Sequence, residues 1–392
     1  MMITASYRID LRYLFGLALL LVSCQNDSPR NEEAEAQQPV MMEVAQQQMV
    51  GTRASQTPLP QDARYACNMF YQSGVNSTEY NASVTAWLLV NADNGNSVYR
   101  QGDFAAPAET DDFLFDKSAP IFYWQNRKAH AFVALADFHR LSGATAGNGL
   151  PSEAEMAKAY SDDPELPDGE KYVTYALKPA DSYEQMPDPI RAVVTKKPSG
   201  YTPEANRVSL LFKHCFSQVQ VNLMPSPDGS TADLTADQIV SVELMGVSTE
   251  GYVAPWIDPS TGEAPPPTYK PVLATDYTLE EWEASKRYGT AMKMFELSEP
   301  TTGYLKSFQT IAFGLVRALR ITWLEKTNGA DITHEAVRSV EEQYQTLKSG
   351  TRHIFNIQLR RGMLAVLDAA VIPWEVDDTS YTTDGSIDTG NH

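Results

Sequence analysis

The sequence is poor in the residues and patterns that catalytic and metal-binding proteins need. Among 392 residues there are three cysteines and six scattered histidines, and neither a CxxC pair nor an HExxH pair occurs. A zinc site is therefore not indicated. A phosphate-binding glycine loop and a GxSxG nucleophile turn are also missing. We predict a protein that is not an enzyme and that binds no cofactor and no metal.

Basic residues are scarce relative to acidic ones. The chain has 31 Lys and Arg against 50 Asp and Glu, which gives a formal net charge of −19. A surface that neutralises phosphates needs clustered Lys and Arg, so nucleic acid is excluded as a partner and electrostatic attachment to an anionic membrane is disfavoured. Hydrophobic residues make up 43% of the chain, which is enough for folded cores.

Long apolar runs are also rare, and the one that occurs is N-terminal. Arg8 and Arg12 precede an apolar run of ten residues at 13–22, which is the length of a signal peptide and too short to span a bilayer. The run ends in Leu21-Val22-Ser23-Cys24, which resembles a bacterial lipobox. We predict a lipoprotein signal at 1–23 and an acyl anchor on Cys24. The alternative is an ordinary signal peptide followed by a chance cysteine.

The residues after Cys24 form a tether by composition. Residues 25–39 are rich in charge, Gln and Pro, whereas 40–50 have few breakers and are compatible with a short strand or a helical turn. Arg53 follows in an open Gly-Thr-Arg-Ala-Ser stretch that a protease can reach. A second linker at 196–206 divides the rest. The predicted boundaries are 1–23 signal, 24–53 tether and possible removable strand, 54–203 first domain, 204–376 second domain and 377–392 polar tail.

Most of the remaining chain consists of short apolar or alternating runs separated by turn residues. No alternation of strands with long helices accompanies them, which favours β-sandwiches over an α/β enzyme. We predict an all-β protein with two tandem β-sandwich domains. The clearest runs are 84–90, 120–124, 129–138, 171–177, 210–223, 239–247, 308–315, 318–323, 355–359 and 365–374.

Two segments carry more specific predictions. The apolar residues of 210–223 change parity, which indicates a bulge near Ser217 or a strand that serves two layers. Apolar residues recur at three- and four-residue steps in 333–347, which indicates a helix. In 355–359, Phe355, Ile357 and Leu359 alternate with polar residues and are predicted to face a core.

Several single residues admit a functional reading beside a structural one. His214 stands between two aromatic residues on a strand and is interpreted as a packed core histidine in preference to a ligand. Trp256 lies in a proline-rich loop at 254–271 and is the best candidate for an exposed contact. Cys67 and Cys215 are either a disulfide of an exported protein or two buried free thiols, and we slightly favour free thiols.

Several features in sequence order resemble one known family. They are the lipobox at Cys24, Arg53 in its loose segment, the run Leu211-Phe212-Lys213-His214-x6-Val221-x-Leu223, and the ending His353-x-Phe355-Asn356-Ile357-x-Leu359-x14-Trp374. The set resembles the fimbrillin-like (Mfa-like) lipoproteins of Bacteroides-type bacteria, which are related to the type V pilins. In this comparison His214, Phe355, Ile357 and Trp374 are the fold-motif residues.

The resemblance implies a fold, a location and a way of assembly. It implies two transthyretin-like Greek-key domains and a surface-exposed lipoprotein of the outer membrane with a role in adhesion. It also implies that an arginine-specific protease removes an N-terminal strand, here 40–50 with Arg53 as the site, and that a strand of a neighbouring fimbrial subunit takes its place. Arg30 and Arg64 are rival cleavage sites.

Three alternatives stay open on the sequence alone. The protein is a polymerising subunit, or a tip or anchor subunit of a fimbria, or a non-polymerising relative. The main rival function is a carbohydrate-binding surface lipoprotein of a glycan-uptake system, which also pairs a lipobox with β-sandwiches and exposed tryptophan. A hydrolase on a β-sandwich is the remaining rival.

Overall fold

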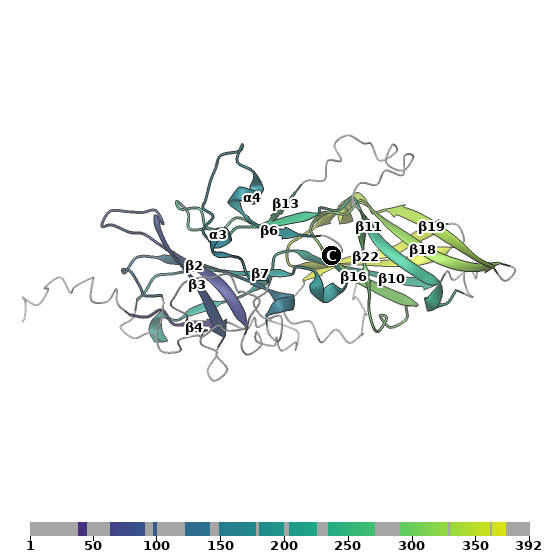
Figure 1. Ribbon diagram of the computed structural model, residues 1–392, viewed down its shortest axis with the longest axis horizontal. Helices are drawn as coiled ribbons and strands as arrows, with labels where there is room; N and C mark the ends of the chain where they lie inside the picture. Colours follow the sequence, from purple (N-terminus) through teal and green to yellow (C-terminus); the bar gives the residue numbers. More distant parts are fainter. Residues whose placement is uncertain are drawn as a thin grey trace, which may run out of the picture.

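The computed structural model describes residues 38–44, 63–90, 97–99, 122–141, 149–177, 180–199, 204–225, 234–270, 291–327, 330–360 and 363–373. Half of these residues lie in β-strands and about a tenth in helices, so the all-β prediction is confirmed. None of the helices in these ranges is long and apolar enough to cross a bilayer. The molecule is elongated, with the early strands toward one end of its long axis and the late strands toward the other (Figure 1).

The early strands form a six-stranded antiparallel sheet in the order β4-β3-β2-β5-β7-β9. These strands are β2 (Arg64–Tyr71), β3 (Ala82–Val90), β4 (Ser97–Tyr99), β5 (His130–Asp137), β7 (Pro189–Lys196) and β9 (Lys213–His214). Every residue of β5 is buried, because both faces of this strand are covered. Phe132 packs into one core, and on the opposite face Val133 packs against Ile257. Residues 131–136 of this strand are apolar at both parities, which is typical of a strand covered on both faces.

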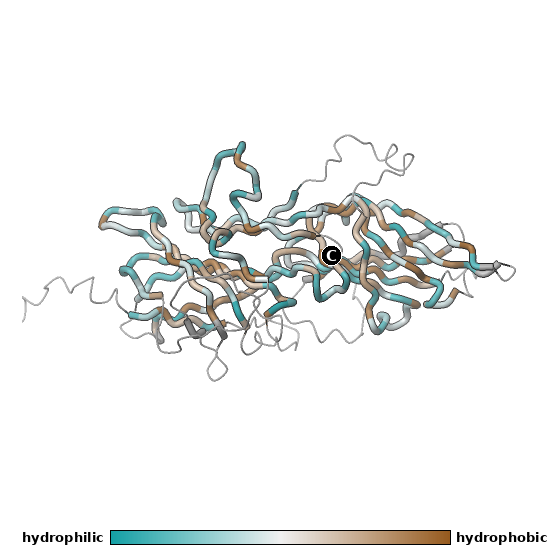
Figure 2. The backbone as a smooth tube through the Cα atoms, viewed as in Figure 1, coloured by the Kyte–Doolittle hydropathy of each residue, from teal (hydrophilic) through white to brown (hydrophobic). Residues whose placement is uncertain are grey.

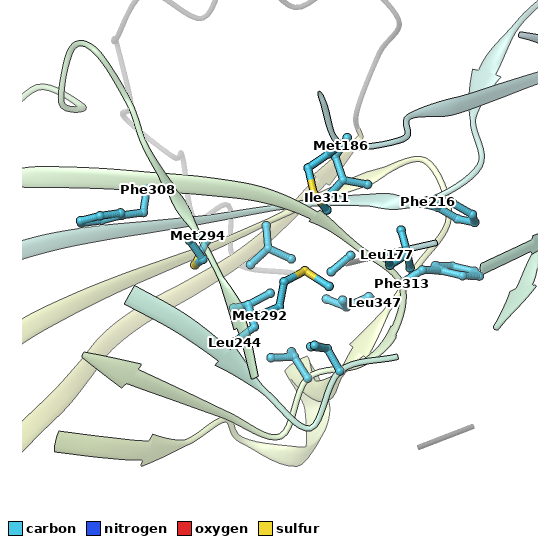
Figure 3. Close-up of a cluster of buried hydrophobic side chains, with 14 of the residues drawn as sticks. Leu177, Met186, Phe216, Leu244, Met292, Met294, Phe308, Ile311, Phe313 and Leu347 are labelled. Atoms are coloured by element: carbon cyan, nitrogen blue, oxygen red, sulfur yellow. The ribbon is translucent and has the colours of Figure 1, made fainter. Parts of the chain in front are cut away.

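The late strands form two sheets that enclose a second core. The five-stranded sheet has the order β15-β16-β10-β21-β22, with strands β10 (Ser217–Pro225), β15 (Phe295–Glu296), β16 (Lys306–Ala312), β21 (Thr351–Arg360) and β22 (Met363–Pro373). The four-stranded sheet has the order β14-β11-β18-β19, with strands β11 (Ile239–Met245), β14 (Ala291–Lys293), β18 (Ala318–Thr327) and β19 (Ala330–Ser339). In Figure 3, Leu244 and Met292 from one sheet and Ile311 from the other point into this core.

The remaining elements are short and connect these sheets. In a three-stranded sheet, β12 (Glu250–Val253) is central and pairs with β6 (Val173–Ala176) on one side and with β13 (Thr268–Tyr269) on the other, so early and late parts of the chain share this sheet. The two-stranded pairs are β1 (Met42–Val44) with β8 (Val208–Leu210), and β17 (Gly314–Leu315) with β20 (Thr346–Leu347). The helical turns are η1 (Phe138–Arg140), α3 (Glu153–Met156), α4 (Asp168–Lys171), η3 (Tyr183–Gln185), η4 (Glu204–Asn206), η5 (Ala236–Gln238) and α6 (Glu342–Gln345). Apolar residues recur along the strands of both ends, whereas the projecting loops are mostly polar (Figure 2).

The parity change in 210–223 marks the passage of the chain between two sheets. Strand β9 ends at His214 in the six-stranded sheet, the chain bends at Cys215 and Phe216, and β10 begins at Ser217 in the five-stranded sheet. This outcome matches a segment that serves two layers and not a bulge. Strand pairing therefore changes at this bend, beyond the 196–206 linker; the domain boundaries themselves stay a prediction.

The helix predicted over 333–347 is wrong for most of its length. Residues 330–339 form β19, which pairs with β18 from Ala318 to Thr327 without a register shift, and only α6 is helical. The backbone of this segment hydrogen-bonds to a neighbouring strand, and this long-range pairing overrides a weak local helical period. The strand predicted at 120–124 is also reduced. Of its described residues, 122–124, only Tyr123 forms a bridge, to Pro39.

The predicted exposure of Trp256 is wrong as well. Its side chain is 3% exposed, and its indole N–H donates to the carbonyl of Lys171 at 2.6 Å. Tyr160 and Tyr172 pack on its ring with centroid distances of 5.3 and 5.4 Å. The proline-rich loop folds back onto the body of the protein, so its tryptophan fills space in the interior. Trp87, Trp124 and Trp323 are buried as well.

The two described cysteines are free thiols, as favoured from the sequence. Cys67 lies in the core beneath the six-stranded sheet, whereas Cys215 lies in the core of the late sheets, so the two sulfurs belong to separate clusters. Burial raises the pKa of the Cys215 thiol to about 12 and raises the pKa of the Cys67 thiol further. Both thiols therefore stay protonated and unreactive at neutral pH.

Candidate functional site: a groove filled by the N-terminal strand

Residues 38–44, which include β1, lie between two other segments. On one side β1 runs parallel to β8, with Met42 opposite Val208, and the N–H of Val208 donates to the carbonyl of Met41 at 2.8 Å. On the other side the N–H of Val40 donates to the carbonyl of Phe122 at 2.8 Å. A further bond joins the N–H of Trp124 to the carbonyl of Gln38 at 3.0 Å. The segment thus satisfies backbone groups of both neighbours, and its removal leaves two edges unpaired.

One face of this segment is part of the core. Val40 and Met42 are completely buried and Val44 is partly buried, whereas Met41 and Glu43, between them, are half-buried on the other face. The buried side chains belong to the same cluster as Tyr65, Phe132 and Leu210. Burial of side chains of this size contributes about 1.5–3 kcal/mol each. We call the space between 122–124 and β8 that these side chains occupy the strand groove.

The outward face of the segment is held by charge. A carboxylate oxygen of Glu43 accepts a hydrogen bond from the guanidinium of Arg207 at 2.9 Å, and the other accepts from the hydroxyl of Ser209. The Ser209 hydrogen bond, followed by the bond and the charge of Arg207, lowers the pKa of the Glu43 carboxyl below its usual value. Glu43 is therefore ionised at neutral pH.

Residues 122–124 form one side of the strand groove and pack against a buried histidine, His130. The Nδ1 of His130 lies 2.9 Å from the carbonyl of Lys128, and its Nε2 lies 3.2 Å from the N–H of Gln125. These partners define a neutral ring that donates through Nδ1 and accepts through Nε2. The ring of Trp124 packs edge-on against it at 4.9 Å. Burial lowers the pKa of His130 to about 4.

The residues predicted from the sequence do not form one site. Cys24, Arg53 and Trp374 lie outside the described residues. Phe355 and Ile357 are 2% and 0% exposed and face the core of the late sheets from β21, together with Leu359, as predicted. His214 is buried in β9, in a different sheet, so it does not approach them through a shared strand.

His214 belongs to a buried polar cluster that joins the ends of three strands. Its Nδ1 lies 2.8 Å from a carboxylate oxygen of Asp188, and the other oxygen of Asp188 lies 4.0 Å from the Nε2 of His139. Asp137 pairs with Arg140 at 2.6 Å beside them, and burial raises the pKa of the Asp137 carboxyl. Asp188 and His214 lie at the junction between the early sheet and the bend, so this cluster has a positional role.

Sequence reasoning missed three residues that matter in the strand groove: Glu43, Arg207 and Ser209. The only local signal is a single carboxylate inside the apolar run Val40-Met41-Met42-Glu43-Val44. Its partners lie more than 160 positions away, and nothing local specifies them. Within the described ranges no group of three or more His, Cys, Asp or Glu side chains is placed to hold a metal ion.

The structure also bears on the rival cleavage sites. Arg64 is the first residue of β2 and pairs with Leu89 of β3, and its N–H donates to the carbonyl of Leu141 at 3.2 Å. A protease needs an extended chain free of such pairing, so cleavage after Arg64 requires local unfolding of the sheet. Arg30 lies outside the described residues.

These features define a class: an all-β protein in which an N-terminal strand completes a layer that the rest of the fold leaves open. Residues 188–374 match the model of the fimbrillin-like family, so this part of the chain is fimbrillin-like and the resemblance seen in the sequence is confirmed. The matched family consists of structural, non-enzymatic proteins, and the match supports a fimbrial or adhesion-type role.

Solved structures with a similar course of the chain come from Bacteroides and Porphyromonas species. A candidate cell adhesion protein from Bacteroides uniformis is 14% identical, with a TM-score of 0.47 over 86% of this chain and 98% of that one. One from Bacteroides ovatus is 15% identical, with a TM-score of 0.42 over 88% and 100%. The tip fimbrial protein Mfa3 from Porphyromonas gingivalis is 8% identical, with a TM-score of 0.41 over 81% and 95%. All three scores are below 0.5, so the family match carries the assignment. No curated protein matches the chain in sequence.

Proposed function

We propose that the protein is a surface-exposed lipoprotein of the outer membrane, anchored through Cys24, and a fimbrial subunit that joins its neighbours by strand exchange. The observation that carries this proposal is the seating of 38–44 in the strand groove. This segment is bonded on both sides and buries Val40 and Met42. A strand held by its backbone and by alternate side chains is replaceable by another strand of the same pattern.

The exchange requires the resident strand to leave, and cleavage at Arg53 provides the means. Arg53 follows β1 by nine positions in sequence and precedes β2 by eleven, so a cut there separates the resident strand from the rest of the fold without interrupting β2. The freed groove then presents unpaired backbone on 122–124 and on β8. Such edges are templates for another chain.

The rival reading as a carbohydrate-binding protein loses its supporting observation. It depended on Trp256 as an exposed aromatic contact, and that side chain is buried and hydrogen-bonded. Strand exchange therefore explains more of the structure than glycan binding does.

The experiment is limited digestion of the full chain with an arginine-specific protease, followed by SDS electrophoresis without boiling and by light scattering. We expect the wild-type protein to form SDS-resistant ladders, and the Arg53→Ala variant to stay monomeric. Arg30→Ala is the matched control, because it removes a rival site in the tether and should assemble like the wild type. A cut protein that stays monomeric at high concentration, with the 38–44 segment dissociated, contradicts the proposal.

A further inference from the structure

The strand groove has a polar recognition element beside its apolar one. In the parallel register of β1 and β8, Glu43 lies opposite Ser209, and Arg207 precedes Ser209 by two positions. Residues two apart on a strand project from the same face, so Arg207 and Ser209 both reach the Glu43 carboxylate. One side of the groove thus accepts apolar side chains. Arg207 and Ser209, which we call the rim of the groove, accept a carboxylate.

A second cation reinforces the rim. The ammonium of Lys196 donates to the carbonyl of Arg207 at 2.9 Å, and its charge contributes to lowering the pKa of Glu43. The chain as a whole carries a charge of −19, so two cations in the neighbourhood of one carboxylate run against the general composition. These cations attract an incoming strand that carries a carboxylate and repel one that carries a positive charge.

The Glu43 carboxylate helps to fix the register in which the strand pairs with β8. A slip of one residue turns Val40 and Met42 out of the core and is strongly disfavoured. A slip of two residues keeps apolar side chains at two of the three core-facing positions but places Gln38 or Gln46 at the third. It also moves the carboxylate along β8 by about 6.6 Å, either beyond the reach of both Arg207 and Ser209 or to the position opposite Arg207 and away from the Ser209 hydroxyl. The rim therefore adds to the core in favouring the observed register.

Resting on the proposed function, we propose that Arg207 and Ser209 select the incoming strand. The partner is an extended segment of another subunit with apolar residues at the positions of Val40, Met42 and Val44 and a carboxylate at the position of Glu43. The same pair sets the register in which that strand binds.

The test uses the full chain with residues 51–55 replaced by the recognition sequence of a protease that does not cut after arginine. After cleavage, fluorescent peptides of residues 38–46 compete for the strand groove, and binding is followed by fluorescence anisotropy. We expect the native peptide to bind about tenfold more tightly than the same peptide with Glu43→Lys, and this preference to shrink in high salt.

Variants at Arg207 and Ser209 separate the effect of charge on peptide binding from the effect of side-chain shape. In Arg207→Glu the preference should disappear or reverse, and Ser209→Ala should weaken the native peptide by a smaller factor. The Arg207 side chain is 31% exposed, so its replacement leaves the core intact. A peptide with Met42→Asp is the matched control and should bind neither protein, because Met42 is an apolar anchor.

The outcomes distinguish this inference from the function on which it rests. Equal binding of the native and the Glu43→Lys peptides to the wild-type groove overturns selection by Arg207 and Ser209 but leaves strand exchange standing. Failure of every peptide to bind a groove from which 38–44 has been displaced overturns strand exchange itself. Reversal of the preference by Arg207→Glu supports both.

Discussion

Burial, more than chemical type, sets the properties of single side chains in this protein. His130 is an example, because its two ring nitrogens are both engaged in the neutral form, and among the described residues no carboxylate offsets its desolvation. His353 is buried in β21 in a similar way, and its pKa is also lowered to about 4 by burial and by the charge of Lys348. Cys215 and Trp256 likewise owe their inertness to their surroundings.

The lowered pKa of His130 predicts a loss of stability in mild acid. The unfolded histidine has a pKa near 6.5 and the folded one about 4, so between these values the unfolded state binds more protons. The free energy of unfolding should therefore decrease as the pH falls from about 6.5 to 4, by up to about 1.4 kcal/mol per pH unit for each such histidine. Urea unfolding at several pH values measures this pH dependence of the free energy of unfolding. His130→Gln should reduce the slope, and identical slopes in wild type and variant would refute the assignment.

The burial of Ile357 predicts that a charge at this position destabilises the core of the late sheets. Ile357→Asp places an unpaired carboxylate among apolar side chains and should cost several kcal/mol, which thermal unfolding followed by circular dichroism detects. Val371→Asp is the matched control, because Val371 lies on the adjacent strand β22 and is 40% exposed. Equal melting temperatures for the two variants would show that β21 does not face the core in this way.

At the scale of the elements, the neighbours of β1 come from distant parts of the chain. Its partner β8 is more than 160 residues away, and the 122–124 wall about 80 residues away. A strand of this kind binds as a separate peptide would, through one row of backbone bonds on each side and two buried side chains. β1 is not a member of the six-stranded sheet, so the strand pairing of that sheet does not depend on it.

We therefore expect that β1 can detach without unfolding the rest of the protein. Met42→Asp should release 38–44 without unfolding the protein, at a cost of a few kcal/mol to strand seating alone. Hydrogen–deuterium exchange should then rise at 40–44 and 208–210 and stay unchanged in β5. Met41→Asp is the control, since Met41 projects from the opposite face of the same segment. If both variants raise exchange equally, the assignment of faces is incorrect.

At the scale of the whole molecule, sheets at the two ends are connected by a shared three-stranded sheet and by the buried cluster around Asp188. This connection gives an elongated body (Figure 1). The net charge of −19 keeps such bodies apart in solution, so association needs a specific contact such as an exchanged strand. The proposed lipid at Cys24 would place the resident strand between the membrane and the fold.

The proposed anchor leads to a prediction for the whole protein. Cys24→Ala should abolish acylation and release the protein from the membrane fraction, because the lipid supplies the hydrophobic attachment. Fractionation of cells and mass spectrometry of the N-terminal peptide measure the two effects. Ser23→Thr is a mild control that keeps the cysteine. Full retention of the Cys24→Ala protein in the outer membrane, with no lipid at its N-terminus, would show that another contact holds it.

Local patterns alone were sufficient to predict much of this protein. Alternation of side chains is a property of five or six consecutive residues, so the strands at β5, β21 and β22 and the inward direction of Ile357 follow from the sequence. The family resemblance also depends on ordered local motifs, and it was confirmed over 188–374. The preference for free thiols at Cys67 and Cys215 was correct as well.

Only the tertiary structure decided which segments meet. The partners of Glu43, the burial of Trp256 and the strand at 330–339 all depend on contacts between residues far apart in sequence. Backbone groups of 330–339 pair with β18, and that pairing outweighs a helical period that is weak in free energy. The strand groove has the same origin. Neither 38–44, nor 122–124, nor β8 carries a local sign of the other two, because the backbone bonds and buried surface that join them exist only once the chain has folded.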